Sequence, residues 1–199
     1  MSFHYKEKQS ITAVILAGGR GRRLGGVDKG LADVGGLPLV HRVLFRIAPQ
    51  VGTVIINANR HHAIYARFGF EVISDTQPDY QGPLAGIAAA LSRCKTPLLL
   101  SVPCDTPSLP LDLAERLYRC MEQHGCDLAV ARDSQRIHPV IALLRTELLP
   151  SLLDYLHSGE RKTGRWIAQQ YHCEADFSDQ PEAFLNINTP EDRARLQNR

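Results

Sequence analysis

The segment ITAVILAGGRGRRLGGVDKG, residues 11–30, joins an apolar run to a loop of glycines and cations. Residues 12–16 are almost continuously apolar up to the glycines, as expected of a strand buried on both faces of a sheet. The five glycines of residues 18–26 let the backbone turn tightly and bring its N–H groups close to a ligand. Three arginines and Lys29 add cationic donors. The segment therefore predicts a polyphosphate site beyond the carboxyl end of a first strand, where open α/β sheets bind ligands.

Two common phosphate-binding loops do not match this segment. A P-loop requires G-x-x-x-x-G-K-[ST], whereas Lys29 follows an aspartate and precedes Gly30. A dinucleotide-binding loop that begins at Gly19 requires a third glycine where this chain has Leu24. A surface loop whose arginines are merely solvated remains the alternative, although such loops rarely carry four cations.

Outward from this segment, short β-rich runs alternate with helical patterns, which is typical of βαβ units on a mostly parallel sheet. We expect an α/β fold with a Rossmann-like, mostly parallel, twisted sheet and helices on both faces. The expected strands are residues 12–16, 53–56, 71–73, 97–102, 127–131, 140–144 and 184–187. The expected helices are residues 38–47, 61–68, 84–93, 111–124, 147–156 and 161–170, and a terminal helix that Thr189 caps and Pro190 begins.

Length and charge narrow the possible classes. The 199 residues suit one domain, for which we expect a flexible stretch 1–10, a nucleotide-binding half 11–110 and a second-substrate half 111–199. A net charge of +2 excludes a protein that coats nucleic acid or a polybasic membrane anchor. The polar start and the short apolar runs predict neither a signal peptide nor a membrane span. Five scattered cysteines without a C-x-x-C pair favour reduced thiols in a cytoplasmic monomer over a disulfide framework or a structural zinc site.

Several polar residues follow the predicted strands. Asp105 follows the run 97–102 between two prolines that stiffen the turn, so we expect a metal ligand there rather than a simple turn aspartate. Asp75 and Asn57 also end strands and could face a ligand or only form turns. Cys104 is better explained as a small buried residue than as a nucleophile. His138 opens a predicted strand and could face a second substrate.

Five segments together resemble the molybdenum cofactor guanylyltransferases, the MobA family of nucleotidyltransferases. The first consists of Leu-Ala-Gly-Gly at residues 16–19, Arg-Leu-Gly at residues 23–25 and Lys29. This signature alone marks only the wider superfamily. Leu24 stands where the family more often has methionine. The other four are N-A-N-R at 57–60, G-P-L-A-G at 82–86, P-C-D-T-P at 103–107 and N-I-N-T-P at 186–190. The resemblance covers nearly the whole chain.

The resemblance implies transfer of GMP from Mg²⁺-bound GTP to the terminal phosphate of molybdopterin, with cofactor-assembly proteins and acceptor molybdoenzymes as further partners. It implies catalytic roles for Lys29, Arg23 and Asp105, with Asp105 as the Mg²⁺ ligand. The residues that it implies for binding the nucleotide and the pterin are Leu16, Ala17, Gly18, Gly19, Arg20, Lys29, Asn57, Asp75, Gly86, Asp105, Asn186 and Asn188.

The residue types suit this reaction. A phosphate monoester is already anionic, so its attack on an α-phosphate needs no general base, only cations that stabilise the charge of the transition state. Two alternatives remain open. One is a related nucleotidyltransferase that acts on another phosphorylated acceptor, and the other is a carrier that binds the finished cofactor without making it.

Overall fold

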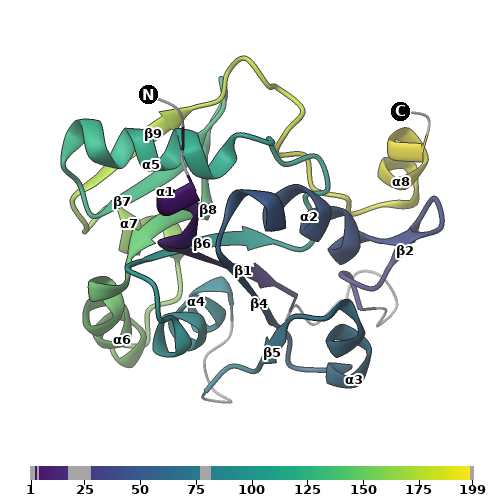
Figure 1. Cartoon of the computed structure of the whole chain (residues 1–199), viewed down its shortest axis with the longest axis horizontal. Coiled ribbons are helices and arrows are strands. Elements are labelled where there is room, and N and C mark those ends of the chain that lie inside the picture. Colours follow the sequence, from purple (N-terminus) through teal and green to yellow (C-terminus); the bar gives the residue numbers. More distant parts are fainter. Residues whose placement is uncertain (1–2, 4, 18–27, 77–81, 198–199) are drawn as a thin grey trace.

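The computed structural model describes residues 3, 5–17, 28–76 and 82–197, and its core is one seven-stranded sheet (Figure 1). The strand order is β5-β4-β1-β6-β8-β7-β9. Only β8 runs antiparallel to its neighbours, so the prediction of a mostly parallel sheet is confirmed. The strands are β1 (Ile11–Leu16), β4 (Thr53–Asn57), β5 (Glu71–Ile73), β6 (Leu98–Pro103), β7 (Leu128–Arg132), β8 (Ile137–Arg145) and β9 (His172–Asp176).

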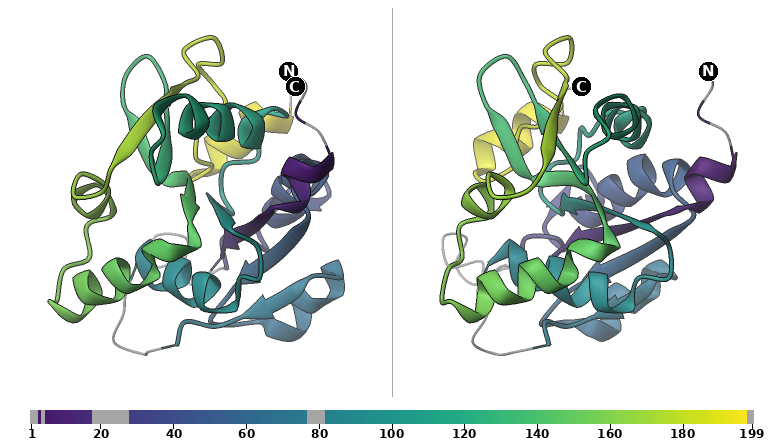
Figure 2. Two further views of the ribbon diagram at one scale, coloured as in Figure 1. Left: turned by 60° about the vertical axis from the view of Figure 1, so that its left-hand side comes forward. Right: turned by 90° about the vertical axis from the view of Figure 1, so that its left-hand side faces the viewer.

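Helices cover both faces of the sheet, as the sequence predicts (Figures 1 and 2). On one face, α2 (Leu39–Ile47) and α5 (Leu113–His124) bury their apolar sides against the sheet. On the other face lie α4 (Pro83–Arg93), α6 (Leu149–His157) and α7 (Thr163–Ile167). Because neighbouring residues of β1 point to opposite faces, Ile15 joins the first core and Val14 the second. This double burial explains the continuous apolar run of that strand.

The register of the central strands sets the position of the site. Leu16, the last residue of β1, lies opposite Asn57 of β4 on one side and Pro103 of β6 on the other. All three strands run in parallel and therefore end at the same edge of the sheet. Polar residues that follow them in sequence are thus brought together at this carboxyl edge.

Short elements complete the structure. They are α1 (Tyr5–Gln9), the two-stranded pair β2 (Asp33–Val34) and β3 (Leu37–Pro38), α3 (His62–Tyr65) and α8 (Pro190–Gln197), with 3₁₀ turns at Ala48–Gln50, Ala66–Phe68 and Thr146–Leu148. Thr189 caps α8 as predicted, since its Oγ1 accepts the N–H of Asp192 at 3.1 Å. Among the described residues, no helix is long and apolar enough to cross a membrane.

Three sequence-based expectations about secondary structure are wrong: one strand, the length of one helix and the start of another. The expected strand at 184–187 is an irregular segment, whose Phe184 and Ile187 are buried although Leu185 and Asn186 are exposed. Such a pattern suits a chain that crosses the end of a sheet rather than one that runs along it. The last strand is instead β9, where residues at every second position are buried. The expected helix 161–170 shortens to α7, and Pro38 belongs to β3 rather than to α2.

Candidate functional site

One part of the carboxyl edge contains Leu16, Ala17, Asn57 and Gly86, four of the predicted site residues. The N–H of Ala17 donates to the carbonyl oxygen of Asn57 at 2.8 Å, so the chain leaves β1 along the end of β4. A Cβ on Gly86 would lie 2.7 Å from Cδ2 of Leu16 and closer still to Oδ1 of Asn57. The absence of a side chain at Gly86 therefore lets the start of α4 approach the ends of both strands.

Lys29, Asp105 and Asn188 form the charged centre of this edge. The Lys29 Nζ donates to Oδ2 of Asp105 and to Oδ1 of Asn188, which joins three segments far apart in the sequence. An ammonium group has three N–H donors, so one donor of Lys29 remains for a ligand. The Lys29 side chain is 25% exposed and that of Asp105 is 11% exposed. The prediction that Lys29 and Asp105 share one site is thus supported by direct contact.

One oxygen of Asp105 has no hydrogen-bond partner in the part of the chain that the structure describes. Its Oδ1 is buried and, among the described residues, accepts no hydrogen bond. A buried carboxylate oxygen without a partner is unfavourable unless a ligand or an ion completes it. Carboxylate oxygens are the ligands that hard cations such as Mg²⁺ select, so Asp105 fits the predicted metal-binding role.

A buried pair behind Lys29 fixes its position. The Tyr65 hydroxyl donates to Oδ1 of Asp28 at 2.6 Å, and the N–H of Gly30 donates to the same oxygen at 3.1 Å. Burial raises the pKa of Tyr65, and its bond to Asp28 raises it further, so the phenol remains a proton donor. A Cβ at Gly30 would lie 2.5 Å from the Tyr65 oxygen. Asp28 therefore holds the turn that carries Lys29, and Tyr65 is a supporting residue that sequence reasoning does not find.

The segment that carries Asn188 is tied to the residues beyond β6. The N–H of Ile187 donates to the carbonyl oxygen of Asp105 at 2.9 Å. The hydroxyl of the fully buried Thr106 donates to Oδ1 of Asn186 at 2.9 Å. Asn186 thus positions the segment, whereas Asn188 reaches the charged centre. Both are predicted site residues, and the structure gives them different contacts.

Asn57 and Asp75, to which the resemblance assigns nucleotide binding, are hydrogen-bonded to each other. Asn57 Nδ2 donates to Oδ1 of Asp75 at 3.0 Å, and Asn59 Nδ2 donates to the other oxygen at 2.8 Å. The backbone N–H of Asp75 donates to the Asn59 side chain at 2.9 Å. Two amides thus fix the carboxylate of Asp75 beside the end of β4. Asn59 is a contributor that its place in the N-A-N-R segment could have indicated.

The remaining sequence-based candidates fall into two groups. Gly18, Gly19, Arg20 and Arg23 lie outside the described residues. The other candidates, His138 and Cys104, are structural.

His138 is 2.8 Å from Asp133 through Nε2 and packs its ring 4.6 Å from that of Phe184. Burial alone would raise the pKa of the Asp133 carboxyl. Hydrogen bonds from the backbone N–H groups of Arg136 and Gln135 and from the His138 ring outweigh this effect and lower the pKa to about 2. Cys104 is buried. Burial raises the pKa of its thiol and the negative charge of Asp105 raises it further, so the thiol is a poor nucleophile.

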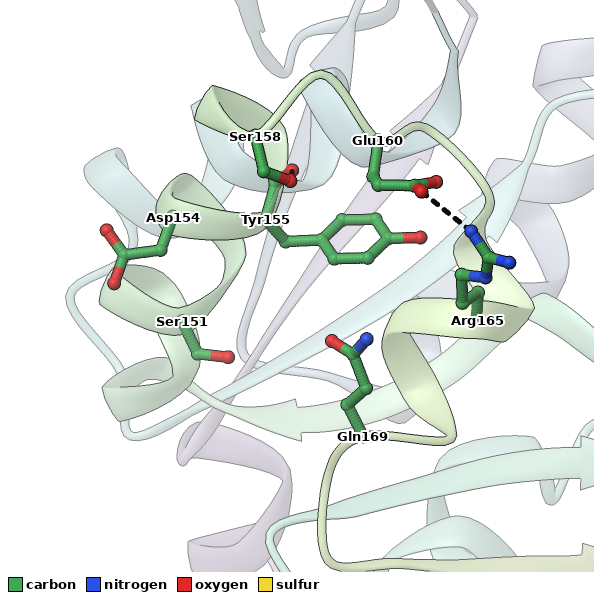
Figure 3. Close-up of a pocket in the computed structure, with 7 residues that line it drawn as sticks. All are labelled: Ser151, Asp154, Tyr155, Ser158, Glu160, Arg165 and Gln169. Atoms are coloured by element: carbon green, nitrogen blue, oxygen red, sulfur yellow. Dashed lines mark hydrogen bonds and ion pairs between the residues drawn. The ribbon is translucent and has the colours of Figure 1, made fainter.

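One hollow lies beside this edge, and another lies away from it. One, of about 970 Å³, begins at Pro107 and Ser108, directly after the loop of Asp105, and extends to α2. The other, of about 520 Å³, lies between α6 and α7, where Arg165 pairs with Glu160, and contains none of the predicted site residues (Figure 3). Trp166 of α7 is only 1% exposed, so its ring packs in the core and does not line this hollow.

The sheet with helices on both faces is a fold that solved nucleotidyltransferases share. A nucleotidyl transferase from Methanothermobacter thermautotroptrophicus has the same fold, with a TM-score of 0.74 at 18% identity over 94% of this chain and 96% of that one. The molybdopterin-guanine dinucleotide biosynthesis protein A of Archaeoglobus fulgidus gives a TM-score of 0.79 at 25% identity, over 94% and 97% of the two chains.

Sequence relatives identify the family within this class. Residues 13–174 match the MobA-like NTP transferase domain. A molybdenum cofactor guanylyltransferase of Shewanella sediminis is 50% identical over 94% of this chain and 95% of its own length. The corresponding protein of Shewanella putrefaciens is 49% identical over the same shares of the two chains. The chain belongs to the MobA-like NTP transferase family.

Proposed function

We propose that this protein transfers GMP from GTP to the terminal phosphate of molybdopterin and releases pyrophosphate. The observation that carries the proposal is the contact of Lys29 with Asp105 and Asn188 at the carboxyl edge of the sheet. The relatives at about 50% identity that are named molybdenum cofactor guanylyltransferase supply the substrates. The product is molybdopterin guanine dinucleotide.

The reaction replaces one phosphoanhydride bond by another. An oxygen of the acceptor phosphate forms a bond to the α-phosphorus of GTP, while the bond from that phosphorus to the bridging oxygen breaks. The electron pair of the broken bond leaves with pyrophosphate. Because the attacking oxygen is already ionised, no side chain has to remove a proton, and catalysis depends on positioning and on charge stabilisation.

Lys29 is the residue best placed to stabilise that charge. Two of its donors are engaged by Asp105 and Asn188, which holds the ammonium group in one position, and the third is available to a phosphate oxygen. A cation whose position is fixed before the substrate arrives does not have to reorganise in the transition state. Asp28 and Tyr65 contribute by fixing the backbone on either side of this lysine.

Asp105 is the residue that would hold Mg²⁺, through the buried Oδ1 that lacks a partner among the described residues. The ion supplies charge neutralisation on the phosphates of GTP when it is bound. Because the same carboxylate contacts Lys29 through Oδ2, Asp105 links the two cations of the site. Both would face the triphosphate, which carries several negative charges.

The substrates are assigned to the two sides of this centre. Leu16, Ala17 and Gly86, with the bonded pair Asn57 and Asp75, form the proposed nucleotide side. Asn186 and Asn188 lie on the proposed pterin side. The backbone hydrogen bond from Ile187 to Asp105 holds their segment beside the loop that leads to Pro107, where the hollow begins. Gly18 is proposed to line the guanine site with Leu16 and Ala17, and Gly19, Arg20 and Arg23 are proposed to bind the phosphates. A monomeric state, a cytoplasmic location and contacts with other assembly proteins or molybdoenzymes stay predictions.

The test is transfer by the purified protein with Mg²⁺, molybdopterin and radiolabelled GTP, CTP or ATP in parallel. The proposal predicts labelled dinucleotide and pyrophosphate with GTP well above the amounts formed with the other two nucleotides. Equal products from the three nucleotides would refute guanylyl transfer. Product with a sugar phosphate or polyol phosphate in place of molybdopterin would favour the related nucleotidyltransferase instead.

A further inference from the structure

Three cysteines and one histidine gather between the end of α5 and the start of β9. Cys120 and His124 stand one helical turn apart on α5, and Cys173 is the second residue of β9. Their potential ligand atoms, two sulfurs and one ring nitrogen, all lie within 4.8 Å of one another. Cys126, which follows α5, is also buried, and its thiol donates to the carbonyl oxygen of Leu128 at 3.3 Å. None of these four residues takes part in the proposed transfer reaction.

The spacing of these groups approaches that of a zinc site. Zinc–sulfur and zinc–nitrogen bonds in tetrahedral geometry place neighbouring ligand atoms about 3.5–3.8 Å apart. The His124 Nδ1 is 3.8 Å from the sulfur of Cys120. The same nitrogen is 2.9 Å from the carbonyl oxygen of Cys120, a hydrogen bond that ligation through Nδ1 would replace. Closing the cluster by about 1 Å or less would thus bring the three groups to ligand distances.

Burial of the cluster also suits a metal site. Cys120 and Cys173 are 7% exposed and Cys126 is fully buried, whereas His124 is exposed. The thiols of Cys120 and Cys173 therefore line the inner side and the imidazole closes the outer side, which gives an ion a route from solvent. Thiolate and imidazole ligands select zinc rather than the magnesium that an oxygen site prefers.

We propose that Cys120, His124 and Cys173 bind one Zn²⁺ that fastens α5 to β9. The cluster lies at the amino end of β7 and β9, because Cys173 is paired with Ala129 near the start of β7. Lys29 and Asp105 lie at the opposite, carboxyl edge. The ion is therefore structural, and its binding stabilises the fold by acting on the folded state alone.

This site escapes sequence analysis because its ligands have no recognisable spacing. The pair of Cys120 and His124 indicates only one helix face, and Cys173 follows about fifty residues later. The expectation that no structural zinc site exists rests on the missing C-x-x-C pairs. Folding brings the ligands together in a way that linear spacing does not show.

The test is titration of the metal-stripped protein, reduced with a phosphine, with Zn²⁺ and with Co²⁺ as a spectroscopic probe. We expect one equivalent of Zn²⁺ to bind, and Co²⁺ to give the visible bands of tetrahedral coordination with sulfur-to-metal charge transfer. Zn²⁺ should raise the melting temperature of the wild type. His124→Ala, whose exposed position leaves the core intact, and Cys173→Ser should each weaken binding at least about tenfold.

Cys94→Ser is the matched control, because Cys94 is a half-buried cysteine outside the cluster, and it should bind zinc like the wild type. Equal zinc affinity of the wild type, His124→Ala and Cys173→Ser would overturn the proposal. So would octahedral Co²⁺ without charge transfer, which indicates oxygen ligands, or a disulfide between these cysteines in the protein purified without reductant.

Discussion

Replacing Gly86 by alanine separates two opposite expectations. Helix propensity alone predicts that Gly86→Ala stabilises α4 by up to about 1 kcal/mol, because alanine is the better helix former. The structure predicts the reverse, since the new Cβ would lie 2.7 Å from Leu16 and closer still to the side chain of Asn57. Asn57 does not move freely, because it is 2% exposed and donates to Asp75.

The net cost follows from these contacts. Overpacking of a filled site typically costs about 1–3 kcal/mol. Displacing Asn57 also loses its hydrogen bond to the Asp75 carboxylate, which contributes about 1.5–3 kcal/mol when the acceptor is charged. After subtraction of the propensity gain, we expect Gly86→Ala to lower the free energy of unfolding by about 1.5–5 kcal/mol. Transfer should also slow, because Asn57 and Asp75 are proposed to face the nucleotide.

Urea denaturation measures the change, with Gly164→Ala as the matched control. A Cβ at Gly164, also in a helix, would be 3.6 Å from Pro139, which is an ordinary contact, so that variant should lose no stability. Combining Gly86→Ala with Asn57→Ala removes one obstacle, and the two changes should then be non-additive by about 1 kcal/mol or more. Additive changes, or a Gly86→Ala variant as stable as the wild type, would refute the steric argument.

Three further predictions concern the charged centre. Tyr65→Phe leaves the buried Asp28 carboxylate without its hydroxyl donor, so urea denaturation should show a loss of about 1.5–3 kcal/mol in the free energy of unfolding. The control Tyr171→Phe, whose wild-type hydroxyl donates to an exposed carbonyl oxygen, should lose less than about 1 kcal/mol, and equal losses in the two variants would contradict the role of Tyr65. Lys29→Ala should weaken GTP binding and slow transfer, measured by titration and by initial rates, and unaltered kinetics would remove Lys29 from the site. Chelation of divalent ions should abolish transfer and added Mg²⁺ should restore it; transfer that persists under EDTA would exclude a metal-dependent reaction.

The central half of the sheet can be predicted because its signals are local. The apolar run of β1 and the polar residues that follow β4 and β6 appear directly in the sequence, and parallel strands bring their ends together. The capping of α8 by Thr189 is equally local. These local signals are sufficient to predict that Asp105 and Lys29 share one edge of the sheet.

The parts that sequence patterns miss depend on contacts between distant segments. The bond between Tyr65 and Asp28 joins residues 37 positions apart, and no periodicity indicates it. The segment 184–187 is apolar enough for a strand, yet it is buried by crossing the sheet edge, where Phe184 packs on Phe177. In β9 the exposed positions are polar, so its alternation is hidden by its low overall hydrophobicity.

The most direct test of the central claim is Asp105→Ala, assayed for both GTP-to-molybdopterin transfer and retention of the fold. If Asp105 holds the metal and fixes Lys29, transfer should fall by about 10²-fold or more while the circular dichroism spectrum is unchanged. Glu160→Gln, which breaks the ion pair with Arg165 in the remote hollow, should leave the rate unaltered. An Asp105→Ala protein that still transfers GMP at a near-normal rate would contradict the account.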